Sequence, residues 1–172
     1  MKIKIKVKED RLPQIISKGD WIDLANETKV ELNGLKKTLY LIAENEQVSV
    51  YDTEYKQISL GVAMQLPKGF EAIVVARSST FKKYGIFNPN AFGVIDNSYC
   101  GNNDIWQLPV ISIKPTTIPA NTRLCQFRIQ LSQKANVWQK LRWLFTNKIE
   151  FERVDILDTN TNRGGFGSTD EN

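Results

Sequence analysis

Hydrophobic and polar residues alternate along much of the chain, in short runs. Near the start, MKIKIKVKED places Ile3, Ile5 and Val7 at every second position, which is the period of a half-buried strand. Turn signals such as Asn33-Gly34 separate this run from several others. The further strand-forming runs are residues 29–32, 38–43, 48–51, 58–66, 71–76, 108–114 and 123–131. Many short strands with little helix predict an all-β barrel or sandwich.

Two segments depart from this pattern. Residues 79–84 are expected to form a short helical turn, and residues 135–147 show apolar residues at helical spacing. We expect the second helix to pack its apolar stripe onto the sheet, because core packing is the common fate of such stripes. A docking or membrane-surface helix is the alternative interpretation. The stripe consists of Val137, Trp138, Leu141, Leu144 and Phe145.

Composition indicates one soluble globular domain. The chain has 172 residues, of which 41% are hydrophobic and 24% charged. No apolar run is long enough to span a bilayer, and the start has no secretory signal core, so we expect a cytoplasmic protein without a membrane partner. The two cysteines, Cys100 and Cys125, are far apart and are expected to be reduced. A net charge of +4 suits a small phosphorylated ligand as well as a polyanion.

The chain contains no histidine. This excludes Ser-His and Cys-His triads and argues against a conventional zinc site. Catalysis would have to depend on carboxylates, basic side chains, backbone amides and an oxygen-ligated metal such as Mg²⁺.

Several polar residues lie where strands are expected to end. Arg77, Ser78 and Ser79 follow one such strand and suit an anion site, although either serine would equally suit a helix cap. Asp23 and Asp96 end short apolar runs, and Gln126 lies within an otherwise apolar strand. Taken singly, each is also explained by an ordinary turn or surface position.

In their order, these segments resemble the motifs of the trimeric dUTPase family, most closely the type found in bacteriophages and Gram-positive bacteria. The family carries five ordered motifs, and each has a counterpart here: GDWIDL, RSS, GVIDNSYCG, RLCQFRI and RGGFGST. The resemblance implies an all-β, dUTPase-like distorted jelly-roll barrel. It also implies hydrolysis of dUTP to dUMP and pyrophosphate, which keeps uracil out of DNA and supplies dUMP, with no nucleic-acid partner.

The third motif would form a hairpin pocket for uracil and deoxyribose. The resemblance implies that Asp96 holds the 3′-hydroxyl and orients or deprotonates the attacking water. Tyr99 would pack beneath the deoxyribose and exclude a 2′-hydroxyl. Asn90, Gly93 and Ile95 would belong to the hairpin that reads the uracil edge.

The remaining motifs would bind the triphosphate. Asp23 would accept hydrogen bonds from waters on Mg²⁺, with Asp20 as a competing candidate. Arg77, Ser78, Ser79 and Gln126 would contact phosphate oxygens.

The Gly-rich end of the chain is expected to be a flexible arm that closes over the site. Phe166 would stack on uracil, while Arg163, Gly167, Ser168 and Thr169 would close over the terminal phosphates. Arg163 lies three residues before Phe166, whereas the family commonly has its arginine five residues before that position.

The expected organisation is therefore a β domain over residues 1–157 and an arm over residues 158–172. Residues 36–55 are interpreted as an extra hairpin and residues 135–147 as an extra helix. The family resemblance also implies a homotrimer with shared active sites. A protein regulator, such as a repressor, is left open as a further partner in a phage context.

Two other functions compete with dUTP hydrolysis. A dCTP deaminase shares the fold, but needs a glutamate on the strand after the third motif, where this chain reads DIWQLPVIS. A nucleotide-sensing regulatory protein without catalysis is the second alternative. The presence of Asp96, Tyr99, Gln126 and Phe166 argues against lost catalysis.

Overall fold

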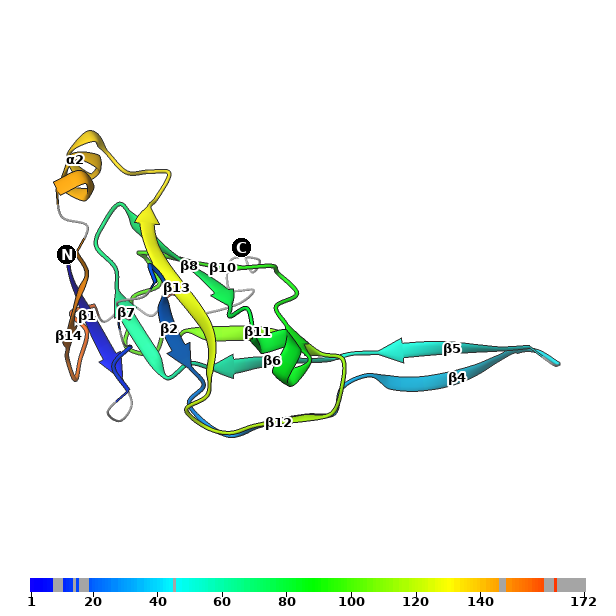
Figure 1. Cartoon of the computed structure of the whole chain (residues 1–172). Helices are drawn as coiled ribbons and strands as arrows, with labels where there is room; N and C mark the ends of the chain where they lie inside the picture. The colour runs from blue at the N-terminus through cyan, green and yellow to red at the C-terminus, as the bar shows by residue number, and fades with distance from the viewer. Residues whose placement is uncertain are drawn as a thin grey trace.

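Strands dominate the structure (Figure 1). The computed structural model describes residues 1–7, 11–13, 15, 19–44, 46–145, 148–159 and 163. The elements are β1 (Lys2–Val7), β2 (Ile22–Ala25), β3 (Val30–Leu32), β4 (Lys36–Ala43), β5 (Glu46–Asp52), β6 (Glu54–Ser59), β7 (Val62–Gln65), β8 (Phe70–Ala76), α1 (Thr80–Tyr84), β9 (Ile86–Phe87), β10 (Gly93–Asp96), β11 (Gln107–Ser112), β12 (Thr116–Ile118), β13 (Arg123–Leu131), α2 (Val137–Phe145) and β14 (Glu150–Arg153).

The strands of the described residues pair into small sheets, and these do not close into one barrel. The largest has the order β10-β8-β13-β2, and all its pairings are antiparallel. The other orders are β14-β1-β7, β6-β11-β9, β12-β3 and β4-β5. The all-β prediction is confirmed. The parallel pairing of β1 with β14 joins the two ends of the described chain, a contact that no local pattern indicates.

The core lies between these sheets, and several strands, such as β1, β3 and β8, bury alternate residues. The pattern is clearest in β1, where Ile3 and Ile5 are fully buried and Lys4 between them is not. Trp106 and Phe127 meet edge to face with ring centroids 5.2 Å apart. This core fixes the strands that carry the site residues.

One expected strand is divided in two. The apolar run over residues 58–66 was predicted as a single strand, but β6 ends at Ser59 and β7 begins at Val62. Gly61 has φ +66, a left-handed conformation that interrupts an extended chain. The sequence pattern did not predict this turn, because the residues on both sides of Gly61 are buried and apolar.

The strands β4 and β5 form a long hairpin that extends away from the rest of the molecule (Figure 1). It lies within residues 36–55, where an extra hairpin was expected. Every residue of β5 is exposed, and so is nearly all of β4.

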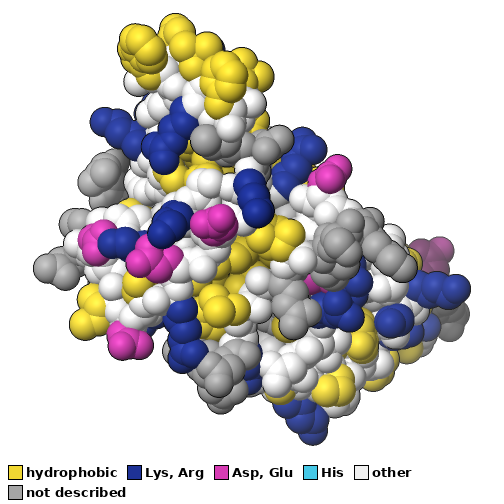
Figure 2. All heavy atoms as spheres, turned by 60° about the vertical axis from the view of Figure 1, so that its left-hand side comes forward, with side chains coloured by type: hydrophobic (Ala, Val, Ile, Leu, Met, Phe, Trp, Pro, Cys, Tyr) yellow, Lys and Arg dark blue, Asp and Glu magenta, His cyan; other side chains and the backbone are white. Residues whose placement is uncertain are grey.

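Helix α2 forms where the 3.6-residue period indicated, but the expected packing of its apolar stripe onto the sheet is wrong. Trp138 is 78% exposed and Phe145 is 83% exposed. Figure 2 shows hydrophobic side chains gathered over this end of the molecule, where α2 lies in Figure 1. The helix instead turns its other side to the body, where Trp143 contacts Phe70 with ring centroids 5.4 Å apart. Among the described residues, neither helix has the length and apolar character that crossing a membrane requires.

Candidate functional site

The GVIDNSYCG segment begins on an edge strand and ends in a tight turn. β10 pairs with β8, which places Asp96 opposite Glu71. At the turn, the Ser98 backbone N–H donates to Asp96 Oδ1 at 2.8 Å, and the Tyr99 N–H donates to the Asp96 carbonyl at 3.2 Å. An aspartate at a strand end closes such a turn with its own side chain. The turn therefore fixes the direction in which the Asp96 carboxylate points.

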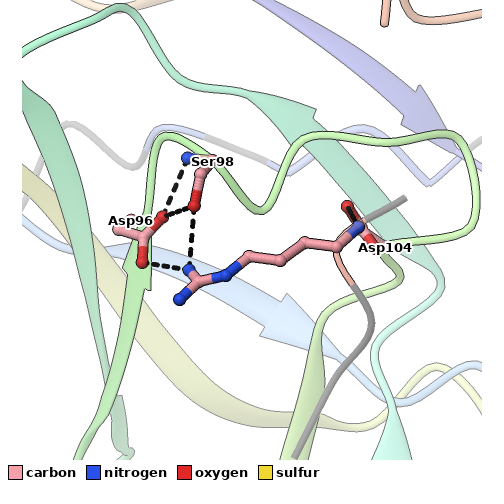
Figure 3. A network of polar contacts seen from close by, with 4 residues as sticks. Asp96, Ser98 and Asp104 are labelled. Atoms are coloured by element: carbon pink, nitrogen blue, oxygen red, sulfur yellow. Dashed lines mark hydrogen bonds and ion pairs between the residues drawn. The ribbon is translucent and has the colours of Figure 1, made fainter. Parts of the chain in front are cut away.

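The Asp96 carboxylate is the centre of a polar network (Figure 3). The Ser98 hydroxyl donates to Asp96 Oδ1, and Arg163 Nη1 donates to Asp96 Oδ2 and, at 2.9 Å, to Ser98 Oγ. The Arg163 backbone N–H donates to Asp104 Oδ2 at 3.2 Å. Arg163 was expected at the terminal phosphates, and the structure places it against the hairpin carboxylate of its own chain.

This network sets the charge of Asp96. Partial burial raises the pKa of the carboxyl, but the hydrogen bonds from Ser98 and the Arg163 guanidinium outweigh it and hold the pKa below its usual value. The side chain is a carboxylate at neutral pH, which is the form that accepts a hydrogen bond or a proton from water.

Tyr99 is half-buried in the same turn. Its hydroxyl donates to the Ile105 carbonyl at 3.1 Å, and its ring packs against the core. Burial raises the pKa of the Tyr99 phenol, and the nearby Asp104 carboxylate raises it further. Tyr99 is therefore a neutral, well-fixed ring whose position does not depend on pH in the neutral range.

The loop before β10 carries Asn90. The Asn90 backbone N–H donates to Asn88 Oδ1 at 2.9 Å, and Ala91 follows with φ +62. Asn88 is buried, and its Nδ2 has no hydrogen-bond partner within the described part of the chain. Its interaction with Asn90 shapes the loop. Gly93 and Ile95 lie on β10 itself, paired with Val74 and Ala72 of β8.

The second group of candidate residues lies around Asp23 on β2. Asp23 is buried, and each of its oxygens meets a different arginine: Arg77 Nε at 3.0 Å from Oδ1 and Arg123 Nη1 at 3.2 Å from Oδ2. Gln126 on β13 is the cross-strand partner of Asp23. The structure thus brings Asp23, Arg77 and Gln126 together. Asp20 precedes β2 and is exposed.

Ser78 and Ser79 stand between β8 and α1. Ser79 is at the N-cap position of α1, but its backbone is αR and its side chain makes no capping hydrogen bond. Helix capping therefore does not account for Ser79, and Ser78 is exposed. Thr80, next in sequence, anchors the turn through a 2.6 Å hydrogen bond from its hydroxyl to the Leu124 carbonyl.

The two groups are separated within one chain. Asp96 lies opposite Glu71 near the start of β8, whereas Arg77 directly follows the end of β8 and Gln126 pairs with Val75. From Glu71 to Arg77 the chain advances six residues, which is about 20 Å in an extended strand. Side chains that act on one phosphorus atom must lie within a few ångströms of it. A single chain therefore presents two half-sites at opposite ends of one strand.

Some of the expected residues fall outside the described part of the chain, namely Phe166, Gly167, Ser168 and Thr169. Conversely, the sequence interpretation did not identify Ser98, Asp104, Asn88 and Arg123, which orient the expected residues. Only the short spacing between Asp96 and Ser98 could have been noticed in advance. Within the described ranges, no cluster of three or more Cys, Asp or Glu side chains is arranged to hold a metal ion.

The fold and these half-sites define an all-β protein with a carboxylate on a hairpin turn and a second, buried carboxylate paired with two arginines. The family model named dUTPase matches residues 39–169. The SPbeta prophage-derived deoxyuridine 5′-triphosphate nucleotidohydrolase of Bacillus subtilis is 38% identical over 171 residues, covering 98% of each chain. This chain belongs to the dUTPase family.

Solved structures show the same fold at lower identity. A mutant dUTPase from phage phi11 of Staphylococcus aureus, described with a structural Mg(II) ion, has a TM-score of 0.55 and 14% identity, covering 78% of this chain and 94% of that one. The dUTPase of Staphylococcus bacteriophage 80alpha, described as controlling transfer of virulence genes, has a TM-score of 0.56 and 14% identity, covering 78% and 93%. The expected family and phage type are confirmed.

A dCTP deaminase needs a glutamate on the strand that follows the hairpin, and this chain has no glutamate there. The strand after the hairpin is β11, where Trp106 precedes Gln107. Trp106 is fully buried in the core, where its ring packs against Phe127.

Proposed function

We propose that this chain is a dUTP diphosphatase that hydrolyses dUTP to dUMP and pyrophosphate. The observation that supports it most strongly is that the turn after β10 holds an ionised Asp96 and, three residues later, the half-buried ring of Tyr99. A general base next to an aromatic platform suits a deoxyribose and an attacking water. The alignment with named dUTP nucleotidohydrolases supplies the substrate.

The β10 hairpin would recognise the nucleoside. Backbone groups around Asn90, Gly93 and Ile95 would read the uracil edge, because uracil and cytosine present different donors and acceptors and a mismatched buried edge is costly. The Tyr99 ring would leave no room for a 2′-hydroxyl. Asp96 would hold the 3′-hydroxyl and accept the proton of the attacking water.

The second half-site would bind the triphosphate. Arg77 supplies a fixed cation, because Asp23 holds its Nε, and Gln126 lies on the adjacent strand. Ser78 and Ser79 add hydroxyl donors. These groups stabilise the charge that develops as pyrophosphate leaves.

The donor set fits Mg²⁺ held mainly by the substrate. Such an ion needs few protein ligands, since phosphate oxygens and waters supply most of its coordination. A carboxylate has about four acceptor positions, and the two arginines use one on each Asp23 oxygen, so Asp23 would still accept hydrogen bonds from metal-bound waters. When bound, Mg²⁺ would neutralise phosphate charge.

We also propose that the active site is shared between chains of a homotrimer. The two half-sites lie about 20 Å apart along β8, by the rise of the six residues from Glu71 to Arg77. This separation favours a site in which the hairpin of one chain meets the arginine site of another. A closed three-fold ring makes this contact for every chain at once.

The C-terminal arm would complete the site. Phe166 would stack on uracil, with Gly167, Ser168 and Thr169 over the terminal phosphates. Arg163 would serve the same phosphates, and its contact with Asp96 holds it at the edge of the site. The proposed domain division is residues 1–157 for the β domain and 158–172 for the arm.

Pyrophosphate release tests the function directly. The protein is incubated with dUTP, dCTP, dTTP or UTP plus Mg²⁺. We expect turnover with dUTP and little with the others, because the hairpin rejects cytosine by polarity, thymine by its methyl group and ribose by Tyr99. Comparable release from dCTP would contradict the proposed substrate.

A further inference from the structure

Two apolar elements project from opposite ends of the molecule. They are α2 and the β4–β5 hairpin, and Figure 1 shows the body of the protein between them. Each leaves large hydrophobic side chains exposed. Because they lie at opposite ends, neither can cover the other within one chain.

The apolar face of α2 turns away from the body. The helix is attached through its other side, by the contact of Trp143 with Phe70 and by a 2.9 Å hydrogen bond from Gln139 Nε2 to the Lys68 carbonyl. The outward face consists of Val137 (68% exposed), Trp138 (78%), Leu141 (40%), Leu144 (73%) and Phe145 (83%). A contiguous patch of this kind marks an interaction site on a soluble protein.

The hairpin has an equally unusual surface. Tyr40 and Val48 are direct cross-strand partners, as are Thr38 and Val50, so these residues share one face. In the described structure, β4 and β5 pair only with each other. An isolated two-stranded hairpin is marginally stable in water, so a covering surface would stabilise it.

The position of each element relative to the half-sites indicates what covers it. α2 contacts Phe70 and Lys68, next to the Glu71–Asp96 end of β8. The hairpin begins beside α1, which follows Arg77 at the other end of β8. Gly34, just before β4, lies close to the Lys114 backbone. The neighbouring Ile113 N–H donates to the carbonyl of Gly85, the residue that follows α1. When the Asp96 end of one chain meets the Arg77 end of the next, α2 of the first therefore comes to the side where the hairpin of the second projects.

We propose that the Tyr40 face of the β4–β5 hairpin covers the apolar face of α2 on a neighbouring chain. This inference rests on the proposed shared site. The charges are complementary, because Glu44 and Glu46 flank the hairpin turn, whereas the segment from residue 132 to 149 contains no acidic residue. The basic residues of that segment are Lys134, Lys140, Arg142 and Lys148.

The dimensions agree. A strand of eight residues such as β4 extends about 26 Å. A helix of nine residues such as α2 is about 14 Å long. The hairpin is long enough to reach across the interface and lie along the whole helix.

Disulfide crosslinking between two kinds of chain tests the contact. Val48→Cys chains carrying one tag are co-expressed with Leu144→Cys chains carrying another, and the purified assembly is mildly oxidised. Mass spectrometry then identifies the linked peptides, which distinguishes the new cysteines from Cys100 and Cys125. The matched control replaces Val48→Cys by Gln47→Cys, on the opposite face of the same strand, since disulfides need Cα atoms within about 7 Å.

We expect most mixed assemblies to yield the 48–144 linkage and few to yield the 47–144 linkage. An oligomer that hydrolyses dUTP but forms neither linkage would overturn this inference and leave the proposed function standing. A monomer without activity would overturn both.

A second measurement needs no engineered cysteine. Leu144→Asp should expose the hairpin, so chymotrypsin should cleave after Tyr40 and Tyr51 several-fold faster than in the unmodified protein. Ile156→Asp, at a residue that is 70% exposed outside α2, is the control and should leave cleavage unchanged. Equal cleavage in all three proteins would contradict the contact.

Discussion

The side chains around Asp96 determine its charge and its direction. Ser98 and Arg163 hold the carboxylate from one side, and the Asx turn fixes its backbone. Asp96 was expected from the sequence as the catalytic residue. Ser98 and Asp104 were not, because their roles depend on which atoms they face in the folded turn.

Replacing Asp96 by Asn tests its role as the base. Asparagine has the same shape but cannot take a proton, so we expect turnover of dUTP to fall about 10²–10⁴-fold. The Kd for dUTP should change little, because binding draws on many other contacts. The exposed Asp155, changed to Asn, is the control and should keep normal turnover. Near-normal turnover of Asp96→Asn would show that another group activates the water.

Arg163→Ala should move the acidic limb of the pH profile. Hydrogen bonding and charge from Arg163 lower the pKa of Asp96, so their loss raises that pKa, and the base becomes protonated at higher pH. The acidic limb of kcat/KM, which reports the free enzyme, should therefore shift to higher pH. Arg163→Lys keeps the charge and should shift it less. An unchanged limb would mean that Arg163 does not contact Asp96 in solution.

Two substitutions at Tyr99 distinguish the role of its ring from the role of its hydroxyl. Tyr99→Phe keeps the ring and loses the hydrogen bond to Ile105, which should lower stability by about 1 kcal/mol and leave the preference for dUTP over UTP intact. Tyr99→Ala removes the ring and should raise turnover of UTP relative to dUTP. The preference is measured as a ratio of kcat/KM values. An unchanged ratio in Tyr99→Ala would exclude the ring from ribose discrimination.

At the scale of elements, the root of the β4–β5 hairpin depends on Gly34. Gly34 has φ +78, and a Cβ there would lie 2.4 Å from the Lys114 carbonyl carbon. Gly34→Ala should therefore lower the free energy of unfolding by about 1–3 kcal/mol. Gly19→Ala is the matched control, because a Cβ there meets nothing within 4 Å. Urea denaturation without nucleotide measures both, and equal values would contradict the close approach.

The periodicity of apolar residues predicted most helices and strands, but not the surface against which each apolar face packs. The alternation in β1 and the apolar run of β13 are local signals, and both strands formed where expected. The stripe on α2 has the correct helical period, yet a period indicates only that one face is apolar. Whether that face meets the sheet or another surface depends on how Trp143 and Phe70 dock, which sequence spacing does not encode.

At the scale of the whole molecule, the sequence order of the motifs identified the family, and the sheet arranges their residues. Asp23 and Gln126 are 103 residues apart in sequence but are cross-strand partners. Their proximity follows from the antiparallel pairing of β2 with β13, which was not predicted because β2 is only four residues long. The arm residues after Arg163 lie outside the described residues, so their roles stay predictions.

The central claim is that a dUTP-hydrolysing site combines the Asp96 hairpin of one chain with the Arg77 half-site of another. Mixing two inactive variants tests it most directly. Asp96→Asn chains keep Arg77, and Arg77→Gln chains keep Asp96, while glutamine can still donate a hydrogen bond to Asp23.

Each variant alone should release almost no pyrophosphate from dUTP. Co-expressed at equal levels and randomly assorted in a closed three-fold ring, they should show about a quarter of the unmodified activity, because about a quarter of the sites then combine both intact halves. Mixed trimers with no activity above that of the two parents would contradict the account.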